Sequence, residues 1–169
     1  MGIDPSLRNS GVACLNWNSE TNEIWVTNCA VLRTPAKIKG LDAIYYMINE
    51  IKKFCERPGI MDCDHAIIEF PAAFYNPKFS AGTMSPLSGI AGAAYTLLND
   101  FEDNPKAELV YPTVWNKRKN KQKTSQIITQ LVGEVADWHF DEPVKNPKLF
   151  EHVIDAVGMC YYVLERDLL

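Results

Sequence analysis

The order of apolar patterns along this chain limits the folds that it can adopt. Three β-type segments come within the first 33 residues: a short apolar stretch at Ile3, then 12–17 and 23–32, separated by the turn sequences 4–11 and 18–22. Helical and strand-like segments follow to the end of the chain. An antiparallel meander followed by alternating helices and strands predicts an α/β fold with a mixed sheet.

The segments after residue 33 predict helices and strands in turn. From Pro35 to residue 55, apolar residues recur at three- and four-residue spacing, which predicts a helix with one apolar face. That face would consist of Ile38, Leu41, Ile44, Tyr45, Ile48, Ile51, Phe54 and Cys55. Strands are predicted over 63–69 and 109–111, and helices over 80–99, 125–138 and 150–168. The prediction is a five-stranded mixed sheet flanked by helices.

Length and composition are typical of one globular domain, spanning residues 1–169. No apolar run approaches the roughly 18–20 residues that cross a membrane, and no signal-peptide pattern opens the chain, so no membrane partner is expected. The five cysteines form no Cys-x-x-Cys pair, which disfavours a zinc ribbon or a thioredoxin-like site. Reduced thiols favour a cytoplasmic location.

Charge is unevenly distributed along the sequence. The net charge of −4 argues against a protein that coats nucleic acid over its whole surface. Positive residues are nevertheless concentrated in one strip, at Lys117, Arg118, Lys119, Lys121 and Lys123. A basic strip on an acidic protein suits contact with DNA phosphates on one face, and a solvated loop explains it equally well.

Three acidic residues occupy positions that favour a function. Asp4 ends the first predicted strand, Glu69 ends an apolar strand, and Asp155 lies inside the most apolar helix. Strand ends are where α/β sheets collect their ligands. Carboxylates brought together repel one another, and a divalent cation removes that repulsion. Hard oxygen ligands suit Mg²⁺, with Mn²⁺ as a substitute, and two such ions can hydrolyse a phosphodiester.

The helix that carries Asp155 holds two further candidates. His152 lies three residues earlier on the same face, where it could bind metal or handle a proton, and Gly158 would let the helix approach the sheet. Structural explanations remain open: Asp4 as a turn former, Glu69 as a surface residue and His152 as an ordinary helix histidine. The spacing is consistent with a two-metal site without establishing it.

Four segments resemble, in order, the motifs of the RuvC-type Holliday-junction resolvases. GIDPS at 2–6 with SGVA at 10–13 is similar to the opening G-I-D-P-G-x-x-x-x-G of that family, and AIIE at 66–69 to its second motif. Asn76, SA at 80–81 and GAA at 92–94 are similar to its third segment, and HVIDA at 152–156 to its D-x-x-D-A motif with histidine first. The resemblance extends over residues 2–163.

The sequence departs from the family pattern at several positions. Ser6 stands in place of the second glycine, Ala91 in place of an arginine, and the lysine-rich residues 116–123 in place of a glycine-containing loop. Several apolar residues usually precede the first motif, whereas only Met1 does so here, so the first strand is expected to be truncated.

The resemblance implies an RNase H-like fold and a Mg²⁺-dependent homodimer. Such an enzyme makes paired nicks across a four-way DNA junction, as a crossover junction endodeoxyribonuclease of a bacterial cell or of a phage. Asp4, Glu69, His152 and Asp155 are carried over as the metal and catalytic residues. The helix over 80–99, rich in small residues, is a candidate dimer surface, although packing within one chain explains it equally well.

Aromatic residues follow Glu69 closely in the sequence, at Phe70, Phe74 and Tyr75. Exposed aromatic rings beside a catalytic glutamate could stack on bases unpaired at a junction. The resemblance favours Phe70 or Phe74 for this contact, and anchoring of the loop into the core is the alternative.

Three other functions remain open. One is a broader debranching nuclease that acts on flaps and forks, and another is a non-catalytic DNA-binding module of the same fold. A third is an actin-like ATPase, which is disfavoured because a chain of 169 residues lacks a second lobe and a glycine-rich phosphate loop.

Overall fold

A five-stranded mixed sheet forms the centre of the molecule. The computed structural model describes residues 1–60, 62–71, 81–100, 105–115, 126–131 and 147–167. The strands are β1 (Gly2–Asp4), β2 (Asn9–Trp17), β3 (Ile24–Arg33), β4 (His65–Glu69) and β5 (Lys106–Val110), in the spatial order β3-β2-β1-β4-β5. The first three strands are antiparallel neighbours, whereas β4 is parallel to β1 and β5 to β4. The predicted meander and mixed sheet are confirmed.

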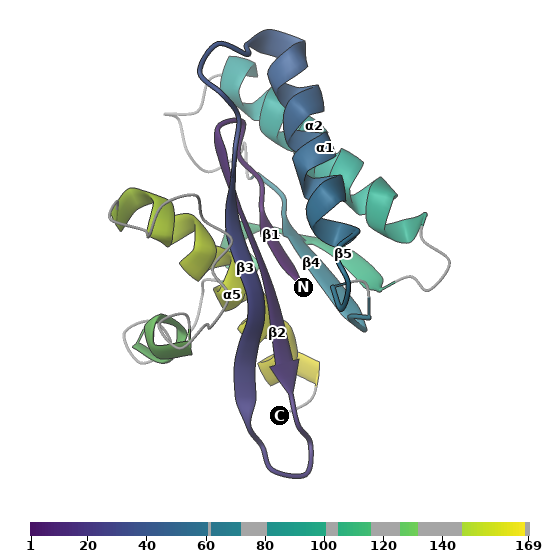
Figure 1. Ribbon diagram of the computed structural model, residues 1–169, viewed down its shortest axis with the longest axis vertical. Helices are drawn as coiled ribbons and strands as arrows, with labels where there is room; N and C mark the ends of the chain where they lie inside the picture. The colour runs from purple at the N-terminus through teal and green to yellow at the C-terminus, as the bar shows by residue number, and fades with distance from the viewer. Residues whose placement is uncertain (61, 72–80, 101–104, 116–125, 132–146, 168–169) are drawn as a thin grey trace.

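Helices cover both faces of this sheet (Figure 1). On one face, α1 (Gly40–Cys55) and α2 (Ala81–Asn99) lie side by side and share a core with β1 and β2. On the other face, α5 (Pro147–Asp167) packs against β2 and β3. A short helix, α3 (Pro112–Trp115), follows β5 and was not predicted. The helix predicted over 125–138 is seen over residues 126–131, and the rest of that range lies outside the described residues.

The alternation of side chains decides which face each strand residue meets. Ile3 and Ile68 point to the side of α1 and α2, where both are fully buried. Their neighbours Gly2 and Ile67 point to the side of α5. Because successive residues of a strand face opposite sides, Asp4 and Glu69 share the α5 side with Gly2 and Ile67.

The prediction for the first helix was wrong at its start. The helix begins at Gly40, whose φ of 61° suits glycine, and not at Pro35. Pro35 and Ile38 form a turn, with the amide of Ile38 donating to the carbonyl of Pro35. A guanidinium from outside the segment fixes this turn, since Nη1 of Arg8 donates to the carbonyl oxygens of both residues, at 3.2 and 2.8 Å.

The buried face of α1 also differs from the predicted one. The buried residues are Ala43, Met47, Ile51, Phe54 and Cys55. Leu41 and Tyr45, assigned to the apolar face, are 81% and 71% exposed. Both readings satisfy three- and four-residue spacing, so periodicity alone did not separate them.

The small residues of α2 fall into two groups. Ala91 and Ala94 are buried in the core between α1, α2 and the sheet, as close packing within the chain requires. A Cβ added to Gly89 or Gly92 would meet no atom within 4 Å, so these two positions border open space.

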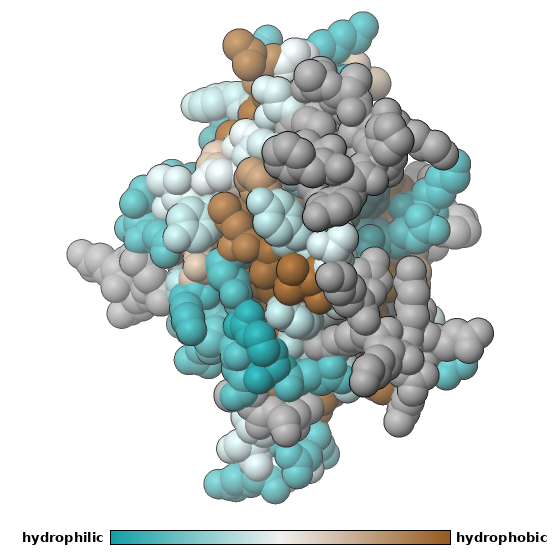
Figure 2. Space-filling view, turned by 180° about the vertical axis from the view of Figure 1, so that it is seen from behind, coloured by the Kyte–Doolittle hydropathy of each residue, from teal (hydrophilic) through white to brown (hydrophobic). Residues whose placement is uncertain are grey.

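None of the helices in the described residues is long and apolar enough to cross a membrane. Figure 2 shows the face opposite to that of Figure 1, where a band of hydrophobic side chains is bordered by hydrophilic ones.

Candidate active site

The parallel pairing of β1 with β4 brings two predicted site residues together. Gly2 pairs with Ile67 and Ile3 with Ile68, so the next residues, Asp4 and Glu69, end neighbouring strands at one end of the sheet. Both face α5, the helix that carries the other two predicted residues. The distant first and second motifs therefore meet because of one strand register.

Two glycines allow α5 to lie directly on the sheet at this place. A Cβ on Gly2 would overlap the carbonyl oxygen of Ala156, and one on Gly11 would overlap the carbonyl oxygen of His152. Gly11 is the partner of Asp4 in the β1–β2 pair. The helix backbone at His152 is therefore held against the sheet beside Asp4.

Asp4 and His152 are in direct polar contact. Nδ1 of His152 lies 2.7 Å from Oδ2 of Asp4, whose residue is 8% exposed. Burial raises the pKa of Asp4, and the hydrogen bond and charge of His152 act against that rise. The hydrogen bond to Asp4 is the largest cause that raises the pKa of His152, and burial opposes it. The pair therefore favours a shared proton between the two side chains.

Glu69 has its own hydrogen-bond donor, the indole of Trp115. Nε1 of Trp115 donates to Oε2 of Glu69 at 2.9 Å. Burial, with the negative charge of Asp4 and a smaller effect of Asp155, raises the pKa of Glu69 to about 7, while the Trp115 bond lowers it. An acidic group poised near neutrality beside other carboxylates is a mark of functional sites.

Asp155 belongs to the same electrostatic cluster. Its charge raises the pKa of both Glu69 and His152, and Glu151 has a smaller effect on His152. The structure thus brings together all four residues predicted for the site. Within the described part of the chain, no three His, Cys, Asp or Glu side chains are gathered closely enough to hold one metal ion as they stand.

The role predicted for Gly158 was wrong. A Cβ at Gly158 would contact the ring of Trp115 at 3.2 Å and the side chain of Ile128 at 3.3 Å. Gly158 therefore makes room for the indole that bonds Glu69, while Gly2 and Gly11 on the strands allow the close approach to the sheet. No pattern in the sequence singled out Trp115, since a tryptophan shortly after Pro112 is typical of an apolar core.

The predicted DNA contacts are only partly described. Phe70 packs on the core beside α2, and its ring meets that of Tyr111 edge-on, with centroids 5.9 Å apart. This position is compatible with the anchoring alternative and lies directly after Glu69. Phe74 and Tyr75, and the whole strip Lys117, Arg118, Lys119, Lys121 and Lys123, lie outside the described residues.

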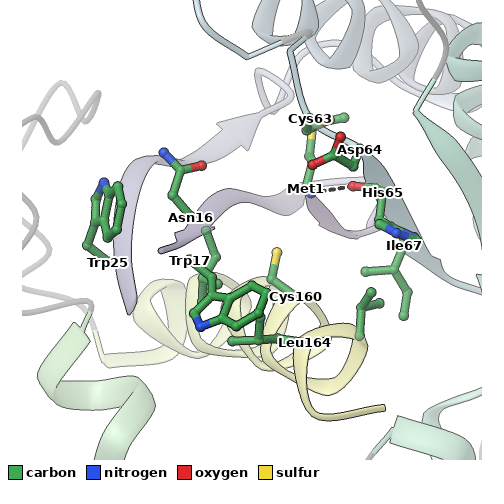
Figure 3. Close-up of a pocket in the computed structure, with 12 residues that line it drawn as sticks. Met1, Asn16, Trp17, Trp25, Cys63, Asp64, His65, Ile67, Cys160 and Leu164 are labelled. Atoms are coloured by element: carbon green, nitrogen blue, oxygen red, sulfur yellow. Dashed lines mark hydrogen bonds between the residues drawn. The ribbon is translucent and has the colours of Figure 1, made fainter. Parts of the chain in front are cut away.

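A cavity of about 310 Å³ lies at the opposite end of the sheet (Figure 3). It is bordered by Trp17 at the end of β2, His65 at the start of β4 and Cys160 on α5. The amino group of Met1 donates to the carbonyl of His65 at 2.6 Å on its wall. None of the four clustered residues lines this cavity, so it is separate from the candidate site.

Comparisons with known proteins agree on one fold. Neither a protein-family model nor a curated protein sequence matches the chain. Among solved structures, RuvC of T. thermophilus in complex with a Holliday junction substrate has a TM-score of 0.67 at 12% identity, covering 98% of this chain and 94% of that one. The fowlpox virus resolvase in complex with Holliday junction DNA has a TM-score of 0.56 at 15% identity, covering 99% and 97%.

A third similar structure is that of a mitochondrial protein. The yeast mitochondrial Holliday junction resolvase Ydc2 has a TM-score of 0.57 at 13% identity, covering 95% of this chain and 78% of that one. At such low identity these structures establish the fold of the chain. The predicted fold is confirmed: the chain has the RNase H-like fold in the form found in RuvC-type Holliday-junction resolvases.

Proposed function

We propose that this protein is a structure-selective DNA endonuclease that cuts four-way junctions by metal-dependent phosphodiester hydrolysis. One observation carries the proposal. Asp4, Glu69 and the His152–Asp155 segment come from three separate elements and converge as one electrostatic cluster, on a fold shared with junction-resolving enzymes. A chance surface cluster would not explain a buried carboxylate paired with a histidine.

The donor set of this cluster fits a hard divalent cation. Three carboxylates with one imidazole offer mainly oxygen ligands, and the mutual repulsion that raises the pKa of Glu69 is what a cation would remove. Asp4, Glu69 and Asp155 would hold Mg²⁺, with His152 as a further ligand or proton handler. The chemistry supplied by bound Mg²⁺ is activation of a water and neutralisation of charge at the phosphodiester.

The remaining work belongs to the side chains of the protein. Asp4 holds Nδ1 of His152, which fixes the orientation of the ring and leaves Nε2 to take or give a proton. Trp115 orients the carboxyl group of Glu69 through its indole N–H. The sheet and α5, locked together at Gly2 and Gly11, keep these groups in register.

Two cuts across a four-way junction need two active sites. A homodimer with two-fold symmetry supplies them, since the junction has the same symmetry. The open positions of α2 at Gly89 and Gly92, next to the exposed Tyr95, make this helix our candidate for the dimer surface. Sedimentation of the protein with and without junction DNA tests this part of the proposal.

A cleavage assay on a synthetic four-way junction tests the main proposal. With Mg²⁺ or Mn²⁺ we expect paired nicks, and with EDTA none. Asp4→Asn should abolish nicking while junction binding persists, and full cleavage by this variant would remove Asp4 from the mechanism. Equal cleavage of flaps and forks would favour a broader debranching nuclease. Binding without nicking under either metal would favour a non-catalytic DNA-binding module.

A further inference from the structure

A hollow at the β3 edge of the sheet lies near the candidate active site. It measures about 520 Å³ and opens between the start of β2 and the connection from β3 to α1. Its lining residues are Arg8, Asn9, Arg33, Thr34, Pro35 and Ala36. Two arginines and a polar backbone in one open hollow suit an anionic ligand.

Strand pairing places this hollow on the catalytic side. Asn9 pairs with Arg33, and two residues further along β2, Gly11 pairs with both Asp4 and Val31. Val31 is buried against α5, so the alternate residue Arg33 belongs to the same face of the sheet as Asp4. Because β1 and β3 run in the same direction, both residues lie toward the end of the sheet from which α1 departs (Figure 1).

The distance from Asp4 to Arg33 follows from this register. The two strand spacings from β1 to β3 amount to about 10 Å across the sheet. The two residues from Val31 to Arg33 add about 7 Å along the strand, at right angles to that direction. The two positions are then about 12 Å apart in the plane of the sheet. This span is short enough for one DNA backbone to contact both positions.

The polar groups of the hollow have donors to spare. Arg8 uses Nη1 for the carbonyls of Pro35 and Ile38, so its Nε–Nη2 edge makes none of the hydrogen bonds seen in the described residues. Arg33 is exposed, and no ion pair within the described ranges involves it.

The charge around the hollow is positive. Lys37 and Lys39 continue the connection after Arg33, and no acidic residue occurs between Arg33 and Asp42. Elsewhere in the described chain, Lys53 is paired with Glu50 and Arg166 with Glu108. A carboxylate cluster repels a phosphate backbone, so a DNA-cutting site of this kind needs cations close by to hold the strand.

We propose that Arg33 and Arg8 form a phosphate-binding site that holds the DNA backbone near the cut. Arg8 keeps the hollow in shape through the turn 35–38 and offers its Nε–Nη2 edge, which makes no hydrogen bond within the described residues, while Arg33 supplies the exposed charge. The assignment to DNA depends on the nuclease proposed above, whereas the affinity of the hollow for phosphate does not.

Salt-dependent binding of a labelled four-way junction in EDTA tests this site with the full-length protein. Each phosphate contact contributes about 0.9 to the slope of log K against log salt. Arg33→Gln should lower the slope by about 0.9, and Arg33→Lys should keep it. The matched control is Lys106→Gln, which removes one exposed charge at the start of β5, at the far end of the sheet. An unchanged slope for Arg33→Gln, or an equal loss for Lys106→Gln, overturns the proposal.

A second arm separates DNA phosphate from free phosphate. Titration with inorganic phosphate should shift the NMR signals of the Arg33 and Arg8 side chains, and Arg33→Gln should weaken the effect. Phosphate binding without any role of Arg33 in junction binding would overturn the assignment to DNA. If the wild type does not nick junctions but the salt dependence of its junction binding still depends on Arg33, the nuclease proposal is rejected and this phosphate site is retained.

Discussion

Gly11 lies directly beneath the backbone of His152, with no room for a side chain between them. The same glycine pairs with Asp4 across the β1–β2 ladder. Gly11, which has no side chain, thus sets how closely α5 approaches the sheet. It also sets the distance from which His152 reaches the carboxylate of Asp4. This contact couples the packing of the fold to the geometry of the candidate site.

Gly11→Ala should therefore damage stability and activity together. The added Cβ would overlap the carbonyl oxygen of His152, and forced overpacking of this kind costs about 1–3 kcal/mol. We expect a lower urea midpoint and strongly reduced nicking. Gly89→Ala is the control for the urea midpoint alone, since Gly89 also lies on the proposed dimer surface; its Cβ meets open space and alanine favours a helix by about 0.5–1 kcal/mol. Equal midpoints for Gly11→Ala and wild type would contradict the tight contact.

His152→Asp tests whether the paired residue belongs to a cation site. The substitution replaces the partner of Asp4 with a second carboxylate, so the two negative charges repel when no cation is present. In EDTA we expect a lower melting temperature than for wild type, and with Mg²⁺ a larger upward shift than the wild type shows. A variant whose melting temperature ignores Mg²⁺ would argue against metal binding at this place.

The strand ends of the site could be predicted from sequence because their signals are local. An apolar strand that ends in a carboxylate is visible at both Asp4 and Glu69, and parallel strands bring such ends together. Asp155 was visible as an acidic residue in an apolar helix, and His152 by its spacing from it. In each case a few neighbouring residues were enough.

Features that depend on distant contacts could not be predicted in this way. The helix start at Gly40 depends on Arg8, about 30 residues earlier, which holds the turn at Pro35. The bond from Trp115 to Glu69 joins side chains 46 positions apart, with no charge or motif to mark the donor. Glycine content alone did not distinguish Gly11, which touches the helix, from Gly158, which faces Trp115.

Trp115→Phe should shift the pH dependence of nicking. The indole bond lowers the pKa of Glu69, so its loss should raise that pKa further above its ordinary value. If the ionised carboxylate is the active form, the acidic limb of the rate profile moves to higher pH. A general loss of stability would lower the rate without moving the limb. Trp25→Phe, at an exposed position on β3, should leave the profile in place.

The stability of the metal-free protein should fall as the pH rises from about 4.5 toward neutrality. Folding raises the pKa of Glu69 from 4.5 to about 7, so the folded state binds the extra proton more tightly than the unfolded state. That contribution is complete below about 4.5 and is lost between there and about 7. The raised pKa values of Asp4 and His152 act in the same direction.

Mg²⁺ should reverse this trend, because cation binding requires deprotonated carboxylates. We expect the rise in melting temperature caused by Mg²⁺ to be larger at pH 8 than at pH 5.5, as measured by calorimetry in matched ionic strength. Glu69→Gln should flatten the pH dependence in EDTA and reduce the Mg²⁺ effect at pH 8. A Mg²⁺ effect of equal size at both pH values in the wild type would show that ions act elsewhere, outside the cluster of Asp4, Glu69 and Asp155.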